Sequence, residues 1–123
     1  MTTHRVPAGH LRLKRVYEPA VSADGVRVLV DRLWPRGLSK EKAGVDHWMK
    51  DIAPSAELRK WFGHDPERWA EFRRRYMQEL RHDAELLEQL RDMASKQTVT
   101  LVFGAHDEEH NDAVVLQEML LKG

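Results

Sequence analysis

Two short apolar segments rich in β-branched residues constrain the fold of this 123-residue chain more than any other feature. Residues 26–30 alternate valine with Arg27 and Leu29, and residues 98–103 form an apolar run that ends at Gly104. Such runs, bounded by turn signals, are typical of buried strands. Strands followed along the chain by helical periodicity indicate a parallel arrangement. We therefore expect an α/β fold with a small, largely parallel sheet and packing helices, in a Rossmann-like three-layer or two-layer arrangement.

A third strand is expected within residues 10–17, where Leu11 and Leu13 alternate with polar residues. Its connection to the strand at 26–30 is shorter than the usual helical crossover of about a dozen residues. The two strands are therefore expected either to pair antiparallel or to occupy non-adjacent places in the sheet. The segment 45–52 is compatible with a strand or with irregular structure.

Helical periodicity and capping residues predict the helices. Ser39 and Ser55 are expected to cap short helices, the second of which stops at Gly63. The acidic residues 108 and 109 are expected in the first turn of the last helix, where they complement its dipole. The sequence leaves open whether the segments 65–80 and 86–93 form one continuous helix or two. The expected helical segments are 39–43, 55–63, 65–80, 86–93 and 107–121.

Composition and length narrow the class of protein. The absence of cysteine excludes thiol catalysis, zinc fingers, iron–sulfur ligation and disulfides. The length fits one domain, so we expect a single α/β domain over residues 1–123, with 1–9 as a flexible N-terminus. No signal-like segment and no run approaching the roughly 18 apolar residues of a membrane span is present, which favours a cytoplasmic protein without a membrane partner.

Sequence fingerprints for common cofactors and nucleophiles are missing from the chain. It contains neither the glycine-rich dinucleotide motif nor the P-loop. The serine nucleophile elbow is missing as well. We therefore expect no bound cofactor.

Positive and negative charges are distributed unevenly, although the formal net charge is zero. Residues 1–81 hold 17 lysines and arginines against 11 aspartates and glutamates, and residues 82–123 hold 3 against 9. The division predicts a basic face and an acidic face that partly neutralise each other. A domain that binds nucleic acid is usually basic overall, so this class is not favoured.

Polar loops follow the two strongest strands, at residues 31–37 and 104–107. If these strands are parallel, the loops share one edge of the sheet, where ligands of open α/β folds bind. A helix N-terminus at the same edge favours anions such as phosphate or carboxylate. The alternative is that Asp31 pairs with Arg32 or Arg36 only to hold its loop. The side chains expected to converge at this edge, a partly exposed tryptophan among them, are Asp31, Arg32, Trp34, Arg36, His106 and Asp107.

Each side chain at this edge has a predicted role. Arg32 and Arg36 would bind the anion, preferably in bidentate fashion. Asp31 would orient an arginine or act as a base. As a phosphoryl-accepting nucleophile it would lack a second carboxylate nearby in the sequence to act as acid. His106 or His110 is the expected proton carrier near neutral pH. The leading hypothesis is therefore a binding or catalytic site for a small anionic ligand.

Residues 106–110 spell His-x-x-Glu-His, the inverted zincin pattern. Two histidines four positions apart on a helix can share a metal ion, with a carboxylate as base. Here the pattern falls on a strand-to-helix turn, so His106 is expected to precede the helix and to face away from His110. We predict an exposed acidic helix start and no metal site.

One run, Asp-Arg-Leu-Trp-Pro-Arg-Gly at 31–37, is quite specific and belongs to a block at 28–37. Further blocks accompany it at 14–17, 53–55 with 58–59, 72–80, 98–101, 107–111 and 113–116. Over nearly its whole length the chain resembles the YeaO-like domain-of-unknown-function family 488. The resemblance implies a compact α/β domain and no established reaction. Members often have lysine where this chain has a histidine at position 106, so the resemblance gives a metal role there no support. The polar signature that the resemblance implies falls on Asp31, Arg32, Arg36, Ser55, Arg59 and Asn111.

A rival hypothesis is a regulatory module that binds nucleic acid or a protein through the basic helix face around 59–81. The arginines at 73–75 fan across the solvent side of their helix, where pairing with Glu71 and Glu79 is expected. Contact with a phosphate backbone is the alternative. A third hypothesis is a structural or regulatory subunit without any ligand.

Overall fold

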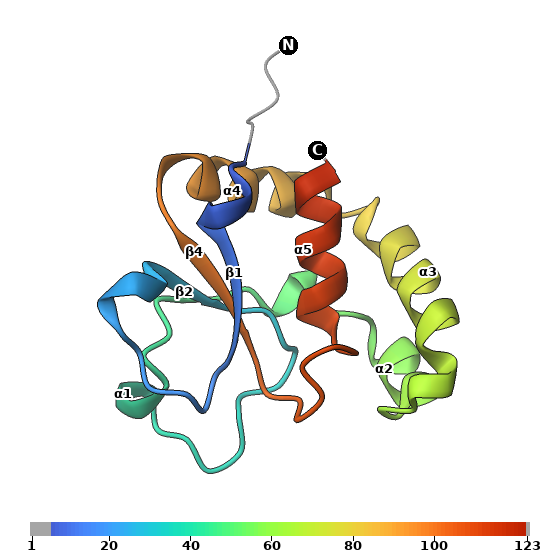
Figure 1. Cartoon of the computed structure of the whole chain (residues 1–123). Coiled ribbons are helices and arrows are strands. Elements are labelled where there is room, and N and C mark those ends of the chain that lie inside the picture. Colours follow the sequence, from blue (N-terminus) through green and yellow to red (C-terminus); the bar gives the residue numbers. More distant parts are fainter. Residues whose placement is uncertain (1–5, 123) are drawn as a thin grey trace.

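Within residues 6–122, which the computed structural model describes, four strands form one sheet whose neighbouring strands all run parallel (Figure 1). The predicted α/β class with a parallel sheet is thus confirmed. The expected flexible segment 1–9 lies partly outside the described residues, and a 3₁₀ turn occupies Ala8–His10. The strands, in the spatial order β1-β4-β2-β3, are β1 (Leu11–Arg15), β2 (Val26–Leu29), β3 (His47–Trp48) and β4 (Val99–Phe103).

The central place of β4 explains how a short connection can join β1 to β2. Leu11 of β1 and Val26 of β2 both lie opposite Val99 of β4, so the two strands flank it. Of the two arrangements left open by the sequence, the non-adjacent one is confirmed and antiparallel pairing is wrong. The carboxyl ends of β1, β2 and β4 consequently meet at one edge of the sheet.

The helices begin and end largely where capping residues predict. Ser39 Oγ accepts the N–H of Lys42, and Ser55 Oγ accepts the N–H of Leu58. Gly63 takes the left-handed conformation that ends the second helix. Within residues 6–122, no helix is long and apolar enough to cross a membrane. The α-helices are α1 (Lys40–Ala43), α2 (Ala56–Phe62), α3 (Trp69–Leu80), α4 (Ala84–Lys96) and α5 (Asp112–Lys122).

The structure corrects the expected start of the last helix, and it settles two points that the sequence left open. The last helix begins at Asp112 and not at Asp107, because Asp107 caps an isolated turn and the acidic residues 108 and 109 precede the helix. The two long helices α3 and α4 are separate, with a turn between them. The segment 45–52 contains the two-residue strand β3 and a 3₁₀ turn at Lys50–Ile52.

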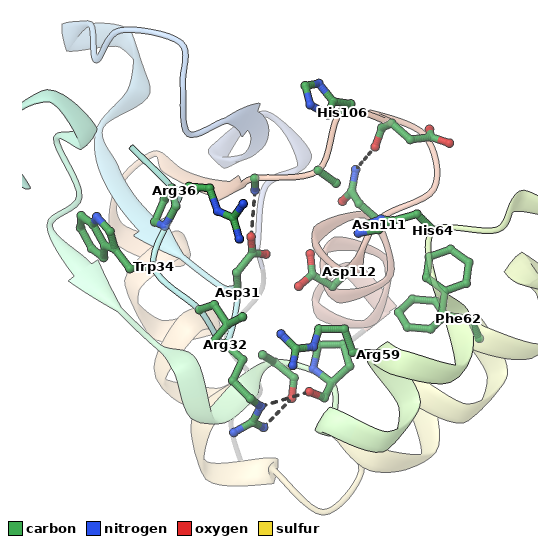
Figure 2. Close-up of a pocket in the computed structure, with 18 of the residues that line it drawn as sticks. Asp31, Arg32, Trp34, Arg36, Arg59, Phe62, His64, His106, Asn111 and Asp112 are labelled. Carbon is green, nitrogen blue, oxygen red and sulfur yellow. Dashed lines mark hydrogen bonds between the residues drawn. The ribbon is translucent and has the colours of Figure 1, made fainter. Parts of the chain in front are cut away.

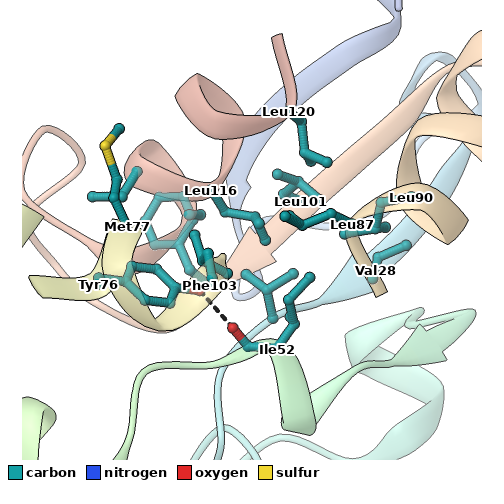
Figure 3. Close-up of a cluster of buried hydrophobic side chains, with 14 of the residues drawn as sticks. Val28, Ile52, Tyr76, Met77, Leu87, Leu90, Leu101, Phe103, Leu116 and Leu120 are labelled. Atoms are coloured by element: carbon teal, nitrogen blue, oxygen red, sulfur yellow. Dashed lines mark hydrogen bonds between the residues drawn. The ribbon is translucent and has the colours of Figure 1, made fainter. Parts of the chain in front are cut away.

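Apolar side chains cover the two faces of the sheet unequally. On one face a large cluster joins the strands to α2, α3, α4 and α5, and the Tyr76 hydroxyl donates to the carbonyl of Ile52 within it at 2.7 Å (Figure 3). The other face carries a small cluster covered by α1 and loops. The sheet forms one layer, and helices α2 to α5 form a second layer on one of its faces. On the other face α1 and the neighbouring loops form a thin third layer. The labelled core residues in Figure 3 are Val28, Ile52, Tyr76, Met77, Leu87, Leu90, Leu101, Phe103, Leu116 and Leu120.

A buried ion pair holds the loop that joins β1 to β2. Arg27 on β2 is 2% exposed and donates to Asp24 at 2.9 Å. Its guanidinium group also reaches the backbone carbonyls of Val16, Glu18 and Ala43. Buried charges persist where they are paired and hydrogen-bonded in this way. These polar contacts tie the loop to the sheet.

Candidate functional site

A cavity of about 550 Å³ opens at the edge of the sheet where β2 and β4 end (Figure 2). Its walls come from the loop after β2, the segment 53–64 around α2, and the loop that leads from β4 into α5. The expectation that the loops 31–37 and 104–107 share one edge is confirmed, because all strand pairs are parallel.

Most of the side chains expected at a site line this cavity, but two do not. Ser55 lies outside it, where its hydroxyl caps α2 and contacts Glu79 Oε2 at 2.6 Å. That contact occupies Glu79, which was expected to pair with the arginines of α3. His110 also lies outside the cavity and packs edge-on against Trp69. The expected residues that do line the cavity are Asp31, Arg32, Trp34, Arg36, Arg59, His106, Asp107 and Asn111.

Aromatic donors hold the backbone of the loop 31–37 in place. Trp48 Nε1 donates to the carbonyl of Asp31 at 2.8 Å, and the Tyr17 hydroxyl donates to the carbonyl of Arg36 at 2.9 Å. Trp34 is half-buried and meets Trp48 edge-to-face, with ring centroids 5.4 Å apart. The side chains of this loop are therefore presented from a restrained backbone.

The opposite loop approaches Asp31 closely. The backbone N–H of Gly104 donates to Asp31 Oδ2 at 2.8 Å. A Cβ at this position would lie 3.3 Å from the same carboxylate oxygen, so glycine gives the backbone the space for this approach. Arg15 holds the loop from the other side by donating to the carbonyls of Gly104 and Ala105.

A second carboxyl group, Asp112, meets Asp31 at the centre of the cavity (Figure 2). The pKa of Asp112 is raised well above its ordinary value by burial among protein atoms, by the charge of Asp31 and by a hydrogen bond between the two groups. The N–H groups of Asp112 and Ala113 act in the opposite direction. Sequence reasoning missed Asp112, because the expected start of the last helix at 107 placed this residue inside the helix and not at its N-terminus.

Three arginines reach the cavity, and they differ in their partners. Arg32 donates to the carbonyls of Pro54 and Ala53 at 3.3 and 3.4 Å, which joins its loop to the segment before α2. Among the described residues the guanidinium groups of Arg36 and Arg59 have no hydrogen-bond or ion-pair partner. Figure 2 shows both groups turned toward the space in front of the two carboxyl groups. Arg36 is exposed and Arg59 is half-buried.

The wall on the α2 side is aromatic. Phe62 and Phe72 stack with ring centroids 4.2 Å apart, and both line the cavity. His64 follows as an exposed cavity residue in the left-handed conformation, with φ of 58°. Sequence reasoning did not place Phe62 and Phe72 at a site, because their helical spacing is also that of ordinary core residues. His64 belongs to no motif in the sequence.

The His-x-x-Glu-His segment folds as a capped turn. Asp107 Oδ1 accepts the N–H groups of Glu109 and His110, and Asp107 Oδ2 lies 2.9 Å from His110 Nδ1. These N–H groups, that of Glu109 first, and the His110 ring lower the pKa of Asp107. Asn111 Oδ1 accepts the N–H of Val114 and so caps α5. Among residues 6–122, no group of three or more His, Asp or Glu side chains is arranged to hold a metal ion.

The arginine run of α3 is engaged in ion pairs. Arg74 and Arg75 pair with Glu71 at 2.6 and 2.7 Å, as expected. Arg73 instead pairs with Glu118 of α5. The expected pairing with Glu79 is wrong, because both oxygens of Glu79 accept hydrogen bonds from Ser55. The Arg73–Glu118 pair joins α3 to α5 at the surface.

Comparison with known proteins places these features in a family. A family model described as "Inactive DUF488-N3 subclade" matches residues 10–123. The uncharacterized protein YeaO of Escherichia coli K12 is 44% identical over 111 residues, which cover 90% of this chain and 96% of that protein. The uncharacterized proteins Rv3073c of Mycobacterium tuberculosis H37Rv and Mb3100c of Mycobacterium bovis are each 46% identical over 110 residues, or 89% of this chain and 92% of theirs. No solved structure matches the chain.

Proposed function

The chain belongs to the YeaO-like DUF488 family, and on that premise we propose that it binds a small anionic molecule, bearing phosphate or carboxylate, at the carboxyl edge of its sheet. The observation that carries the proposal is the pair of arginines, Arg36 and Arg59, that face the cavity without an internal partner. Arg59 is half-buried, and charged side chains that are withdrawn from water are normally paired. Their planar guanidinium groups suit bidentate contact with phosphate or carboxylate.

The local charge also supports an anionic ligand. Arg32, Arg36 and Arg59 contribute three positive charges to the walls. Of the three carboxyl groups that line the cavity, Asp31 contributes one negative charge, Asp112 has a raised pKa, and Asp107 is compensated by backbone N–H groups and His110. A positive balance remains in a recess with apolar walls, where electrostatic attraction is stronger than in open water.

Binding without turnover is better supported than catalysis. The matching family model carries the description inactive. One oxygen of Asp31 accepts the N–H of Gly104. The ring of His110 lies outside the cavity and contacts the Asp107 carboxylate. Of the proton carriers expected from the sequence, only the exposed His106 lines the cavity.

Thermal unfolding in the presence of small anions tests the proposal. The panel holds organic phosphates, organic carboxylates and inorganic phosphate, each against chloride at equal ionic strength. A ligand at about a hundred times its dissociation constant adds roughly 2.7 kcal/mol of stability, which raises the midpoint by several degrees. We expect such a shift for one class of anion in the wild type, and its loss in folded Arg36→Gln and Arg59→Gln.

Lys60→Gln is the matched control, because Lys60 is the exposed neighbour of Arg59 on α2 and does not line the cavity. It removes one positive charge from the same helix and should retain the shift. A shift of equal size in all three variants would place the anion elsewhere. A wild type that responds to no anion would remove the proposal.

A further inference from the structure

Resting on the proposed function, we infer that the ligand carries hydroxyl or ammonium groups beside its anionic group, and that the Asp31 and Asp112 carboxyl groups receive them. The ligand class is therefore a hydroxylated or aminated organic anion. The arginines would hold its phosphate or carboxylate, and the carboxyl pair would hold its hydrogen-bond donors.

The carboxyl groups of Asp31 and Asp112 have hydrogen-bond acceptor sites that no protein group fills among the described residues. An ionised carboxylate offers about four acceptor sites. Among the described residues, Asp31 receives one N–H, from Gly104, and one contact from Asp112. Both carboxyl groups line the cavity, and Figure 2 shows them at its centre. Acceptor sites therefore remain open toward a ligand.

The second step is that the carboxyl groups and the arginines share one cavity without pairing. Among residues 6–122, neither Asp31 nor Asp112 forms an ion pair with Arg36 or Arg59. A ligand that was only anionic would place its charge beside that of Asp31, and like charges at close range are unfavourable. A ligand with donors next to its anionic group satisfies both sets of side chains.

Cavity size and lining give the third step. A volume of about 550 Å³ is typical of sites for small organic molecules and exceeds what a single inorganic anion fills. The stacked rings of Phe62 and Phe72 supply an apolar wall for a carbon skeleton. The site therefore fits a molecule of several carbons that presents its polar groups on one side.

Matched ligand pairs test the inference on the wild-type protein, so that no variant has to fold. The pairs are malate against succinate, aspartate against succinate, and glycerol 3-phosphate against propyl phosphate, with dissociation constants from calorimetric titration. A site built to bind a hydroxyl group discriminates strongly against an analogue that lacks it. We expect the hydroxylated or aminated member of at least one pair to bind at least about tenfold tighter.

The variant Asp112→Asn assigns the discrimination to the carboxyl pair. It keeps the shape of the side chain and should reduce the preference while leaving binding of the unsubstituted anion. Glu108→Gln is the control, because Glu108 is exposed in the loop before α5 and does not line the cavity, so its loss should leave the preference unchanged.

The outcomes separate this inference from the proposed function. Equal affinity of both members of every pair, lost in Arg36→Gln, would overturn the inference and leave anion binding in place. A preference that survives Asp112→Asn unchanged would overturn the role of the carboxyl pair. Binding of no member of any pair would remove the proposed function together with the inference.

Discussion

At the scale of single residues, Asp31 and Asp112 bring two acids into contact, and within residues 6–122 neither forms an ion pair. Burial and the charge of Asp31 raise the pKa of Asp112, while Arg36 and Arg59 face the pair from the cavity walls. Burial raises the pKa of the Tyr76 hydroxyl, and the nearby charges of Asp112 and Asp31 raise it further. The folded protein therefore retains a proton on Asp112 at pH values where the unfolded chain has lost it.

This retained proton predicts how stability depends on pH. Because the folded-state pKa of Asp112 exceeds its ordinary value of 3.8, its contribution is fully present below that pH and is lost as pH rises through the folded value. Asp112→Asn removes the titration, so the free energy of unfolding of the wild type should fall relative to the variant as pH increases. Each unit of pKa difference corresponds to about 1.4 kcal/mol. Urea unfolding between pH 4 and pH 8 measures the difference.

The exposed Glu108, in the neighbouring loop, supplies the control for this titration. Glu108→Gln also removes one carboxyl group, and its stability curve should run parallel to that of the wild type. Parallel curves for Asp112→Asn as well would show that the carboxyl pair does not hold a proton in the folded protein.

The site residues that sequence reasoning found are those whose neighbourhood is set by the chain itself. Asp31 and Arg36 belong to one loop after a strong strand, so their place at the sheet edge follows from the strand directions. Asp112 meets Asp31 only because β4 lies beside β2 and carries the start of α5 to the same edge. Ser55 and His110 bear functional groups, but local capping and ring packing take them out of the cavity.

At the scale of elements, the turn before β2 packs closely against the start of β4. Gly25 has φ of 63°, and a Cβ there would lie 2.2 Å from the carbonyl oxygen of Thr98. The next residue, Val26, donates its N–H to that same carbonyl at 3.0 Å, which aligns the start of β2 with β4. A side chain at Gly25 would push these two strands apart.

Two glycine substitutions separate backbone strain from this steric conflict. Gly63 also has a positive φ, of 54°, but a Cβ there would approach nothing closer than 3.6 Å. Gly63→Ala should cost about 1–2 kcal/mol for the left-handed conformation alone. Gly25→Ala adds the clash with backbone, so its loss should be larger by at least about 1–3 kcal/mol. Chemical unfolding of both variants measures the gap, and equal losses would contradict the close approach at Thr98.

Elements with a strong local signal were predicted from the sequence, and those that depend on distant contacts were not. The runs at 26–30 and 98–103 and the caps at Ser39 and Ser55 act through short-range preferences. The start of α5 was misplaced because Asp107 and Asn111 are both good caps, and only the packed helix selects the second. The two-residue strand β3 forms because it pairs with β2. Its own sequence does not predict that contact.

At the scale of the whole molecule, the opposed charges of the two parts of the chain meet across the fold. The basic part includes α3 and the acidic part includes α5, and Arg73 pairs with Glu118 where these helices pack. Arg74 and Arg75 are paired within α3. The basic face expected around 59–81 is therefore partly neutralised by the protein itself, which weakens the hypothesis of a nucleic-acid module.

A binding measurement with nucleic acid decides whether enough basic surface remains. Affinity for a phosphate backbone depends on how many phosphates a protein neutralises, and it falls steeply with salt when that number is large. We expect only weak binding of labelled single- and double-stranded oligonucleotides at low salt, and none at moderate salt, by fluorescence anisotropy. Neutralising Arg73, Arg74 and Arg75 together should change this little, with thermal unfolding as the control for folding. Tight, salt-sensitive binding lost in the triple variant but kept in Arg36→Gln would instead assign function to α3, apart from the cavity.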